Sequence, residues 1–351
     1  MKPASWAGLE SALGSRPEAS RWERVGLGQQ KSIIHRPDGS PCGVPSASGQ
    51  GFGDLAAVVL LSGSVRPTNF ATSIGRSLLE LPIDQGRTIL DHWCAAIEGL
   101  AAQLGREKLA VRIMTDQDSA PLVTREPDLG RIVVSIEADP YAYRGTGGLI
   151  RDLAVEFDDD QYLLVINGFQ ILVEDLGAIA AELAAKRSDV TIVGHLDGTP
   201  SGVLLGRCGP LKSIPESGYV DMKEQALPSL AQRSKVLVAS REAPTGLPIR
   251  TLSDYMSALR LFHGRALGRD GEGDPFAENL TPLFSIIEDD ADVEPSATIQ
   301  DTVVLGGATV EGRSVVARSL VCPGARVRAG QRVADRLIVG QSEKPGSERY
   351  T

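Results

Sequence analysis

Cysteine, histidine and aromatic residues are scarce in this 351-residue chain, and long apolar runs are missing from it. The four Cys form no Cys-x-x-Cys pair and the four His form no His-x-x-x-His pair, so the sequence predicts neither a disulfide framework nor a zinc site. No window approaches the ~18 uninterrupted apolar residues of a membrane span, and the first residues lack an apolar run of signal-peptide length. We therefore expect a soluble, cytoplasmic protein without a membrane partner.

Positive charge is also in deficit. The chain has 36 Lys and Arg against 45 Asp and Glu, a formal net charge of -9. Nucleic-acid phosphates attract clustered cations, so we expect no nucleic-acid partner, and an anionic ligand would need a local basic pocket. The length favours two domains, or one large domain with an appendage. The 38 Gly are more than average composition supplies, which favours a turn-rich α/β fold or a repeat.

The chain divides into three regions by composition and pattern. Residues 1–53 form an N-terminal extension that ends in a linker rich in Gly, Pro and Ser, and we assign no function to it. Residues 54–270 alternate between apolar runs and helical periods. The expected strands span 55–63, 109–115, 131–138, 162–168, 189–196 and 235–240, and the expected helices span 88–104, 148–157, 176–186, 224–232 and 252–267. In the first of these helices, Thr88 and Asp91 fit a capping box, and Trp93 belongs to the apolar face. This β-α-β alternation predicts a mostly parallel sheet with helices on both faces.

The third region, 271–351, has a different period. Val293, Ile299 and Leu305 are six residues apart. The same spacing separates Val321, Val327, Val333 and Val339, while Val310 and Val316 join the two series with one-residue slips. An apolar residue at every sixth position, with turns between, is typical of a left-handed hexapeptide β-helix, here of fewer than three coils with about eighteen residues each. The alternative is a loose tail rich in glycine.

Five segments then occur in an order that resembles a known family. They read AAVVLLSGSVRP at 56–67, GRSLLELP at 75–82, GTGG at 145–148, NGF at 167–169 and GLPIRTLSDY at 246–255. Together with the predicted tail, this order resembles the sugar-1-phosphate nucleotidyltransferases, or NDP-sugar pyrophosphorylases, and most of all their mannose-1-phosphate guanylyltransferase branch. The resemblance covers about 54–340 and implies a Rossmann-like nucleotidyltransferase sheet followed by the β-helix.

The resemblance implies a nucleotide site made by three of these segments. The loop with Ser62, Gly63, Ser64 and Arg66 would hold the phosphates, and Gly63 after a buried strand would let backbone N–H groups approach them. Arg76 stands where the family has a lysine, so Arg66 and Arg76 are the catalytic candidates. The remaining nucleotide-binding candidates are Gly145, Thr146, Gly147, Asn167 and Gly168. A plain strand turn explains the first loop equally well, and a glycine-rich helix start is the alternative for Gly145 to Gly148.

The family's two metal-binding aspartates are missing from the matching positions. Those positions are Phe169 and Pro248, and neither side chain supplies the oxygen ligands that Mg²⁺ needs. Asp175 and Asp254 are the nearest substitutes, although each fits the start of a helix as a cap. The run at 158–160 precedes a strand and fits a solvated turn. Glu216, Asp221 and Lys223 resemble the family's sugar-side segment and are the sugar-binding candidates.

Two hypotheses follow from this pattern. The first is a protein that binds a nucleotide or sugar nucleotide but is catalytically degenerate, similar in this respect to the silent alpha subunit of the GDP-mannose pyrophosphorylase. The second is an active pyrophosphorylase with relocated ligands, which would need Mg²⁺. Acyl transfer by the β-helix is disfavoured, because no His follows His263. We expect the β-helix to serve assembly, either as a homo-oligomer or with an active paralogue.

Overall fold

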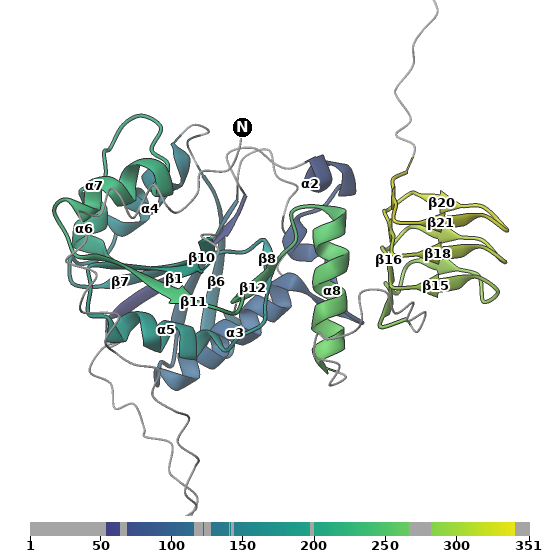
Figure 1. Ribbon diagram of the computed structural model, residues 1–351, viewed down its shortest axis with the longest axis horizontal. Coiled ribbons are helices and arrows are strands. Elements are labelled where there is room, and N and C mark those ends of the chain that lie inside the picture. Colours follow the sequence, from purple (N-terminus) through teal and green to yellow (C-terminus); the bar gives the residue numbers. More distant parts are fainter. Residues whose placement is uncertain are drawn as a thin grey trace, which may run out of the picture.

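The computed structural model describes residues 54–63, 69–115, 122, 128–139, 141, 144–196, 200–266 and 282–340. The predicted extension at 1–53, and with it the boundary at 271, lie outside the described residues. An α/β part and a coil of short parallel strands stand side by side, with α8 (Leu252–Ala266) between them (Figure 1). None of the helices in these ranges has the length and apolar character needed to cross a bilayer.

The α/β part is built on one mixed sheet, as the alternating pattern predicts. Its strands in spatial order are β11 (Val236–Arg241), β9 (Val190–His195), β10 (Pro200–Arg207), β7 (Tyr162–Asn167), β1 (Leu55–Ser62), β4 (Leu109–Thr115), β6 (Ile132–Ala138) and β5 (Asp128–Leu129). The pairs β11–β9, β7–β1, β1–β4 and β4–β6 are parallel. Only β10 and β5 run antiparallel to their neighbours. The sheet is therefore mostly parallel.

Helices cover both faces of this sheet because its strands are buried on both sides. Along β1, Val58 and Leu60 belong to one apolar core, and Ala57 and Val59 belong to the other. The first core is completed by α3 (Ile89–Gln103), α5 (Leu176–Ala185) and α8, and the second by α4 (Gly145–Ala154), α6 (Cys208–Lys212) and α7 (Leu227–Ala231). The predicted capping box at the start of α3 is confirmed in both of its hydrogen bonds.

Several short elements complete the α/β part. They are α2 (Asn69–Ile74), η1 (Leu78–Glu80), η2 (Met222–Ala226), the pair β2 (Pro82–Asp84) and β3 (Arg87–Thr88), and the pair β8 (Gln170–Leu172) and β12 (Gly246–Pro248). The β8–β12 pair is antiparallel and follows the carboxyl end of β7. The sequence did not predict this pair, which brings positions 169 and 248 close together in the candidate site.

The C-terminal coil, residues 282–340, consists of three parallel ladders that the chain visits in turn. The first ladder is β13 (Ser285–Ile287), β16 (Thr302–Val304), β19 (Leu320–Val321) and β22 (Leu337–Ile338). The second is β14 (Asp292–Val293), β17 (Thr309–Val310) and β20 (Arg326–Val327), and the third is β15 (Thr298–Gln300), β18 (Val315–Ala317) and β21 (Arg332–Ala334). Paired residues such as Thr298 and Val315 lie 17 positions apart. One layer therefore takes 17 residues, not the expected eighteen or so.

The inward side chains of the coil correct two of the predicted positions. Ile287, Val293, Ile299, Val304, Val310, Val316, Val321, Val327, Val333 and Ile338 share the coil's own core. Their spacing runs six, six and five, so one five-residue step closes each layer. Leu305 instead packs in the core of the α/β part, and Val339 is 47% exposed. Both predictions were wrong because a five-residue step follows Ile299 and Val333, so the inward residues are Val304 and Ile338, one position earlier.

The coil shares an apolar core with the α/β part along its first ladder. Phe284, Ile286, Val303, Leu305 and Leu320 face outward from the coil and belong to the same buried cluster as α3 and α8. Polar contacts border this cluster, among them an ion pair between Arg260 of α8 and Asp301. The other two ladders are left to face away from the α/β part.

Candidate functional site

The carboxyl edge of the sheet brings two of the predicted nucleotide-binding segments together. Because β1 and β7 are parallel neighbours, Leu61 pairs with Asn167, and the Gly168 N–H donates to the Leu61 carbonyl at 2.9 Å. Ser62 is buried at the end of β1 and Gly63 follows it half-buried. The chain thus places these two turns beside each other at the edge where open α/β sheets bind ligands.

The turn at 167–169 accepts hydrogen bonds from a buried side chain that was not predicted as part of the site. The fully buried Trp93 of α3 donates its indole N–H to the carbonyls of Gly168 and Gln170, each at 3.1 Å. The Asn167 amide oxygen accepts from the Phe169 N–H at 3.0 Å. Trp93 was predicted only as one apolar member of a helix face, because no local signal reveals a hydrogen bond across 75 residues.

The two positions that lack the family's aspartates meet across the short β8–β12 pair. Pro248 lies opposite Gln170, and the Ile249 N–H donates to the Phe169 carbonyl at 3.2 Å. Phe169 packs against the apolar core, whereas Pro248 is exposed. The backbones at these two positions are therefore close together, while their side chains have different surroundings. Within the described ranges, no three His, Cys, Asp or Glu side chains gather as a metal site would require.

The carboxylates considered as substitutes differ in their availability. Asp175 caps α5, since its carboxylate accepts the Ala178 N–H at 2.7 Å and lies 3.3 Å from the Gln103 amide. Asp254 donates its own N–H to the Thr251 hydroxyl at 3.1 Å, while its carboxylate has no partner in the described part of the chain. The three aspartates at 158–160 are exposed in a turn before β7, as predicted.

Another part of the chain packs against the glycines at the start of α4. Gly145 has a φ of +71°, and a Cβ there would lie 2.5 Å from the Val220 carbonyl oxygen. The Gly147 N–H donates to that same carbonyl at 2.9 Å, and the Thr146 hydroxyl accepts from the Met222 N–H at 3.2 Å. The glycines thus admit the segment 219–222, which is the helix-start alternative left open by the sequence.

Of the three sugar-binding candidates, Asp221 lies on that segment, Glu216 precedes it and Lys223 follows it. Asp221 caps η2 by accepting the N–H groups of Lys223 and Glu224, each at 2.8 Å. Glu216 is exposed, and its carboxylate lies 3.4 Å from the guanidinium of Arg151. The structure therefore gives Asp221 a capping role and leaves Glu216 accessible beside α4.

The catalytic candidates are not gathered at the edge in the described residues. Arg76 forms a two-point ion pair with Glu288 of the coil, at 2.8 and 3.1 Å, so its guanidinium joins the coil to the α/β part. Ser64 and Arg66 lie outside the described residues, and their roles stay predictions.

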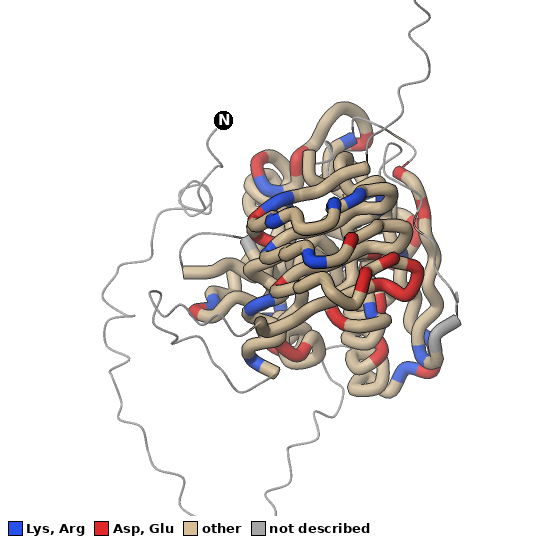
Figure 2. The backbone as a smooth tube through the Cα atoms, turned by 90° about the vertical axis from the view of Figure 1, so that its right-hand side faces the viewer, with Lys and Arg blue, Asp and Glu red and all other residues tan. Residues whose placement is uncertain are grey.

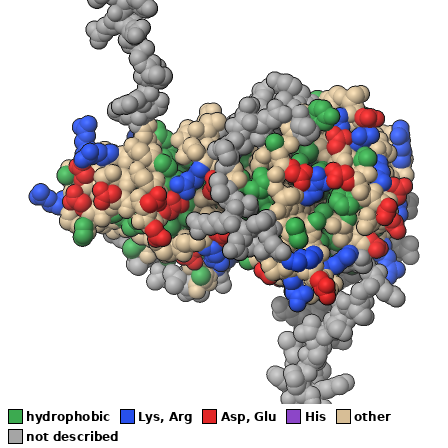
Figure 3. Space-filling model, turned by 180° about the vertical axis from the view of Figure 1, so that it is seen from behind, with side chains coloured by type: hydrophobic (Ala, Val, Ile, Leu, Met, Phe, Trp, Pro, Cys, Tyr) green, Lys and Arg blue, Asp and Glu red, His purple; other side chains and the backbone are tan. Residues whose placement is uncertain are grey.

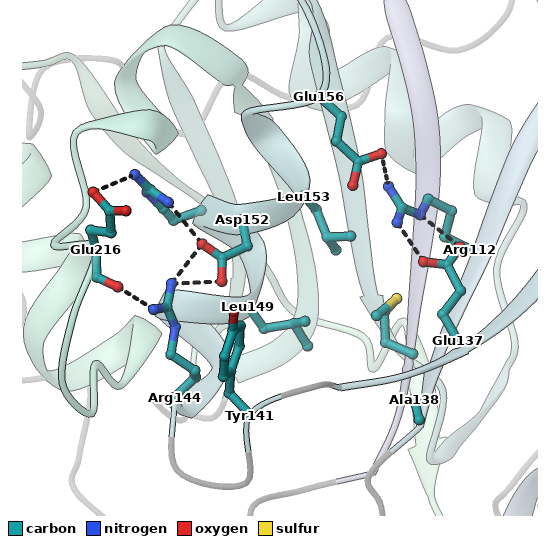
Figure 4. A pocket seen from close by; sticks show the side chains of 12 residues that line it. Arg112, Glu137, Ala138, Tyr141, Arg144, Leu149, Asp152, Leu153, Glu156 and Glu216 are labelled. Atoms are coloured by element: carbon teal, nitrogen blue, oxygen red, sulfur yellow. Dashed lines mark hydrogen bonds and ion pairs between the residues drawn. The ribbon is translucent and has the colours of Figure 1, made fainter.

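A pocket of about 550 Å³ lies between α4 and the strands β4 and β6 (Figure 4). Its lining includes Glu216 and two networks of ion pairs. Arg112 of β4 reaches Glu137 of β6 and Glu156 after α4. Its hydrogen bonds are the largest cause of the lowered pKa of Glu137. Each guanidinium of these networks is already paired with carboxylates. The pocket therefore has no uncommitted arginine in these networks to attract an anion.

Arg144 and Asp152 make up the second network of this pocket. Arg144 bonds both oxygens of Asp152 at 2.6 Å, and its guanidinium lies 5.3 Å from the centre of the Tyr141 ring. On the back of the molecule, side chains of both charges are intermingled with apolar ones (Figure 3).

Burial raises the pKa of the Cys94, Cys208 and Cys322 thiols to about 11, which leaves none of these three as a ready nucleophile.

Comparison with known proteins yields structural likeness only. No protein-family model matches the chain, and no curated protein matches it. Similar solved structures include HddC from Yersinia pseudotuberculosis, 17% identical with a TM-score of 0.45 over 59% of this chain and 100% of that one. HddC complexed with GMP-PN is 16% identical over the same shares, with a TM-score of 0.44. A putative glucose-1-phosphate thymidylyltransferase from Bacillus anthracis, in complex with a sucrose, is 12% identical with a TM-score of 0.44 over 62% of this chain and 97% of that one.

Proposed function

We propose that the chain binds a nucleotide or sugar nucleotide at the carboxyl edge of its sheet, as a catalytically degenerate relative of the sugar-1-phosphate nucleotidyltransferases. The edge offers what such a ligand needs. Gly63 has no side chain that would keep phosphate oxygens away from the backbone at this turn. The exposed Asn167 keeps its amide NH₂ available, because only the amide oxygen is used within the turn.

The observation that carries this proposal is the meeting of Phe169 and Pro248. Their backbones lie close together where the resemblance assigns two aspartates, and neither side chain supplies an oxygen ligand. In phosphoryl chemistry, Mg²⁺ neutralises the charge that develops between an anionic nucleophile and an anionic target. Without several kcal/mol of that stabilisation the reaction slows on the order of a thousandfold or more. We therefore assign this site to binding and regulation.

The finer assignments belong to the same proposal. The ladders of the coil have the inward apolar spacing of a left-handed hexapeptide β-helix. We assign the coil to that class, and the ligand preference to the guanylyltransferase-like branch that the motifs resemble. Assembly through the coil and a cytoplasmic location complete the proposal.

Binding is tested by isothermal titration calorimetry of the full chain with a panel of nucleoside triphosphates and nucleoside-diphosphate sugars. We expect at least one ligand to bind, and Asn167→Ala to weaken it about tenfold or more, since one charge-assisted hydrogen bond contributes roughly 1.5–3 kcal/mol. Gln232→Ala, which removes an exposed amide far along the chain, is the matched control and should bind as the wild type does. Absence of binding by every member of the panel at millimolar concentration contradicts the proposal.

The active pyrophosphorylase remains the second candidate because of Asp254. Its carboxylate, six residues beyond Pro248, is uncommitted among the described residues and would be an oxygen ligand for Mg²⁺. Release of pyrophosphate from nucleoside triphosphates and sugar 1-phosphates with Mg²⁺ is the assay. Turnover that Asp254→Asn abolishes, or that Asp175→Asn abolishes, favours this candidate. Ligand binding without turnover favours the degenerate protein.

A further inference from the structure

The C-terminal coil is electrically polarised along its axis. Residues 282–301, which make the first layer, contain six carboxylates and no Lys or Arg. Residues 302–318 contain one carboxylate and two arginines, and 319–336 contain one carboxylate and four arginines. Figure 2, which faces the coil, shows the basic positions on its upper rungs and the acidic ones lower. This order is unusual in a chain whose net charge is -9.

The register places this polarity on one exposed ladder. In the second ladder Asp292 pairs with Thr309, and Thr309 pairs with Arg326. Two positions further on, Glu294, Glu311 and Arg328 follow one another in successive layers. The Glu294 N–H donates to the Val310 carbonyl at 2.9 Å, and the Glu311 N–H donates to the Val327 carbonyl at 3.0 Å. Both columns of this ladder therefore run from acidic to basic over two layers, roughly 10 Å.

Many charged side chains of the coil form no ion pair with another of the described residues. The exposed carboxylates at the first layer are Asp289, Asp290, Asp292 and Glu294. The exposed guanidiniums are Arg313 in the middle layer and Arg328, Arg332 and Arg336 at the other end. Within the described ranges none of these eight side chains takes part in an ion pair. In the middle layer, hydrogen bonds from the Ala329 N–H and from Arg326 lower the pKa of Glu311 and keep it ionised and matched.

We propose that the coil pairs side by side with the coil of a second copy of this chain, antiparallel, through the β14–β17–β20 ladder. A two-fold axis across the layer of Thr309 reverses the second coil. Each copy then sets Arg326 and Arg328 opposite the partner's first layer, with its Asp292 and Glu294. The same surface serves both copies, so the contact closes at two chains. A parallel arrangement would instead oppose like charges, which costs binding energy.

The size of the surface fixes the expected strength. One side of a three-layer coil is small beside the 1,200–2,000 Å² buried by standard stable interfaces, so we expect a dissociation constant on the order of micromolar. Salt screens exposed charges over about 8 Å at 0.15 M ionic strength, so the association should weaken as salt rises. This pairing rests on the assembly role that the proposed function gives the coil, and it does not depend on the ligand site. Failure of ligand binding and failure of pairing are therefore distinguished by separate experiments.

Sedimentation velocity of the full chain over a concentration series tests the pairing. We expect a monomer–dimer equilibrium at 50 mM NaCl that shifts at least tenfold toward monomer at 500 mM. The variant Arg326→Glu with Arg328→Glu should be monomeric, and so should Asp292→Lys with Glu294→Lys. A mixture of these two variants should form dimers again, because each presents the charge that the other lacks. Arg233→Glu, at the far end of the α/β part, is the control and should leave the equilibrium unchanged.

Three results overturn the proposal. A wild type that stays monomeric at 200 µM in 50 mM NaCl removes the pairing altogether. Monomers in the mixture of reversed variants show that the two ends do not meet. A series of ever larger species, in place of a dimer, shows head-to-tail stacking of the coils. Each variant's circular dichroism and thermal unfolding establish that it is folded, which separates a lost contact from a lost structure.

Discussion

The α/β sheet and the C-terminal coil both rely on parallel strands, yet they expose their polar groups in different places. In the sheet, β1 and β7 are buried on both faces, so polar groups appear only where the strands end, at Ser62 and Asn167. In the coil each strand has two or three residues, of which one points inward, and in the second and third ladders its neighbours point away from the coil's core. The sheet therefore places chemistry at an edge, while the coil places charge along its sides.

The largest effect is expected at Trp93, which supports the edge of the sheet. Trp93→Ala removes a fully buried ring and two hydrogen bonds, and we expect it to lower the free energy of unfolding by about 3–5 kcal/mol. Trp93→Phe keeps most of the ring but leaves two carbonyls unsatisfied, so about 1–3 kcal/mol should be lost. Urea unfolding followed by circular dichroism measures both. Equal losses for the two variants would show that packing, and not the indole N–H, holds the turn.

The second prediction distinguishes a steric clash in the α/β part from backbone strain alone, by comparing two glycine-to-alanine substitutions. Gly145→Ala would bring a Cβ to 2.5 Å from the Val220 carbonyl oxygen at a φ of +71°. Gly75 has a similar φ of +72° with nothing within 4 Å of such a Cβ. Strain alone costs roughly 1–2 kcal/mol, so Gly75→Ala should lose about that much. We expect Gly145→Ala to lose about 3 kcal/mol or more, and matching losses in thermal unfolding would speak against the contact with Val220.

The coil offers a smaller effect that tests its inward pattern. Val310 is fully buried in the coil's own core, and truncation to Ala should cost about 2 kcal/mol through lost burial and a cavity. Val339→Ala removes the same atoms from a side chain that is 47% exposed, and should cost less than about 0.5 kcal/mol. Denaturant unfolding of the pair measures the difference. A larger loss at Val339 than at Val310 would contradict the six, six, five spacing.

The smallest effect is a pH dependence that contrasts an ion pair of the sheet with one of the coil. Hydrogen bonds from Arg112 are the largest cause of the lowered pKa of Glu137, and those from Arg318 are the largest cause for Asp335. A lowered pKa contributes stability that is complete above the unfolded value, about 4.3 for Glu, and is lost as pH falls through the folded value. Glu137→Gln should therefore reduce stability at pH 7 and lose that effect below pH 4.

Exposure decides which of these two pairs contributes more. The Glu137 side chain is 33% exposed and that of Asp335 is 63% exposed, so solvent screens the coil pair more. Urea midpoints at pH 3.5, 5 and 7 should show a smaller change for Asp335→Asn than for Glu137→Gln. The reverse order would mean that exposure does not govern these pairs.

Local patterns were sufficient for much of the α/β part. The Thr88–Asp91 capping box marks the start of α3 because its two hydrogen bonds join residues three apart. Strand β4 has the predicted bounds, since its apolar run ends where polar residues begin. The direction of the strand at 200–207 could not be predicted, because an apolar run has the same composition whichever way its strand runs. Its antiparallel place between β9 and β7 appears only in the sheet.

The candidate site shows the same division. The resemblance of the segment order to a known family brought Ser62 and Gly63 into one hypothesis with Asn167 and Gly168. The structure places both turns at one edge, where parallel strands end. The resemblance also identified Phe169 and Pro248 as residues without oxygen ligands. Their meeting across β8 and β12 needed the tertiary structure, and so did the segment 219–222 that fills the space above Gly145.

What the sequence by itself determined is the order of elements, most of the apolar repeat of the coil and the absence of carboxylates at positions 169 and 248. Each depends on residue type and short spacing, which the chain displays directly. Only the tertiary structure decided that Arg76 pairs with Glu288, 212 residues away, that Trp93 supports the turn, and that Leu305 leaves the coil's core for that of the α/β part. The physical reason is that hydrogen bonds, ion pairs and shared burial act between surfaces, and which surfaces meet is fixed only when the whole chain has packed.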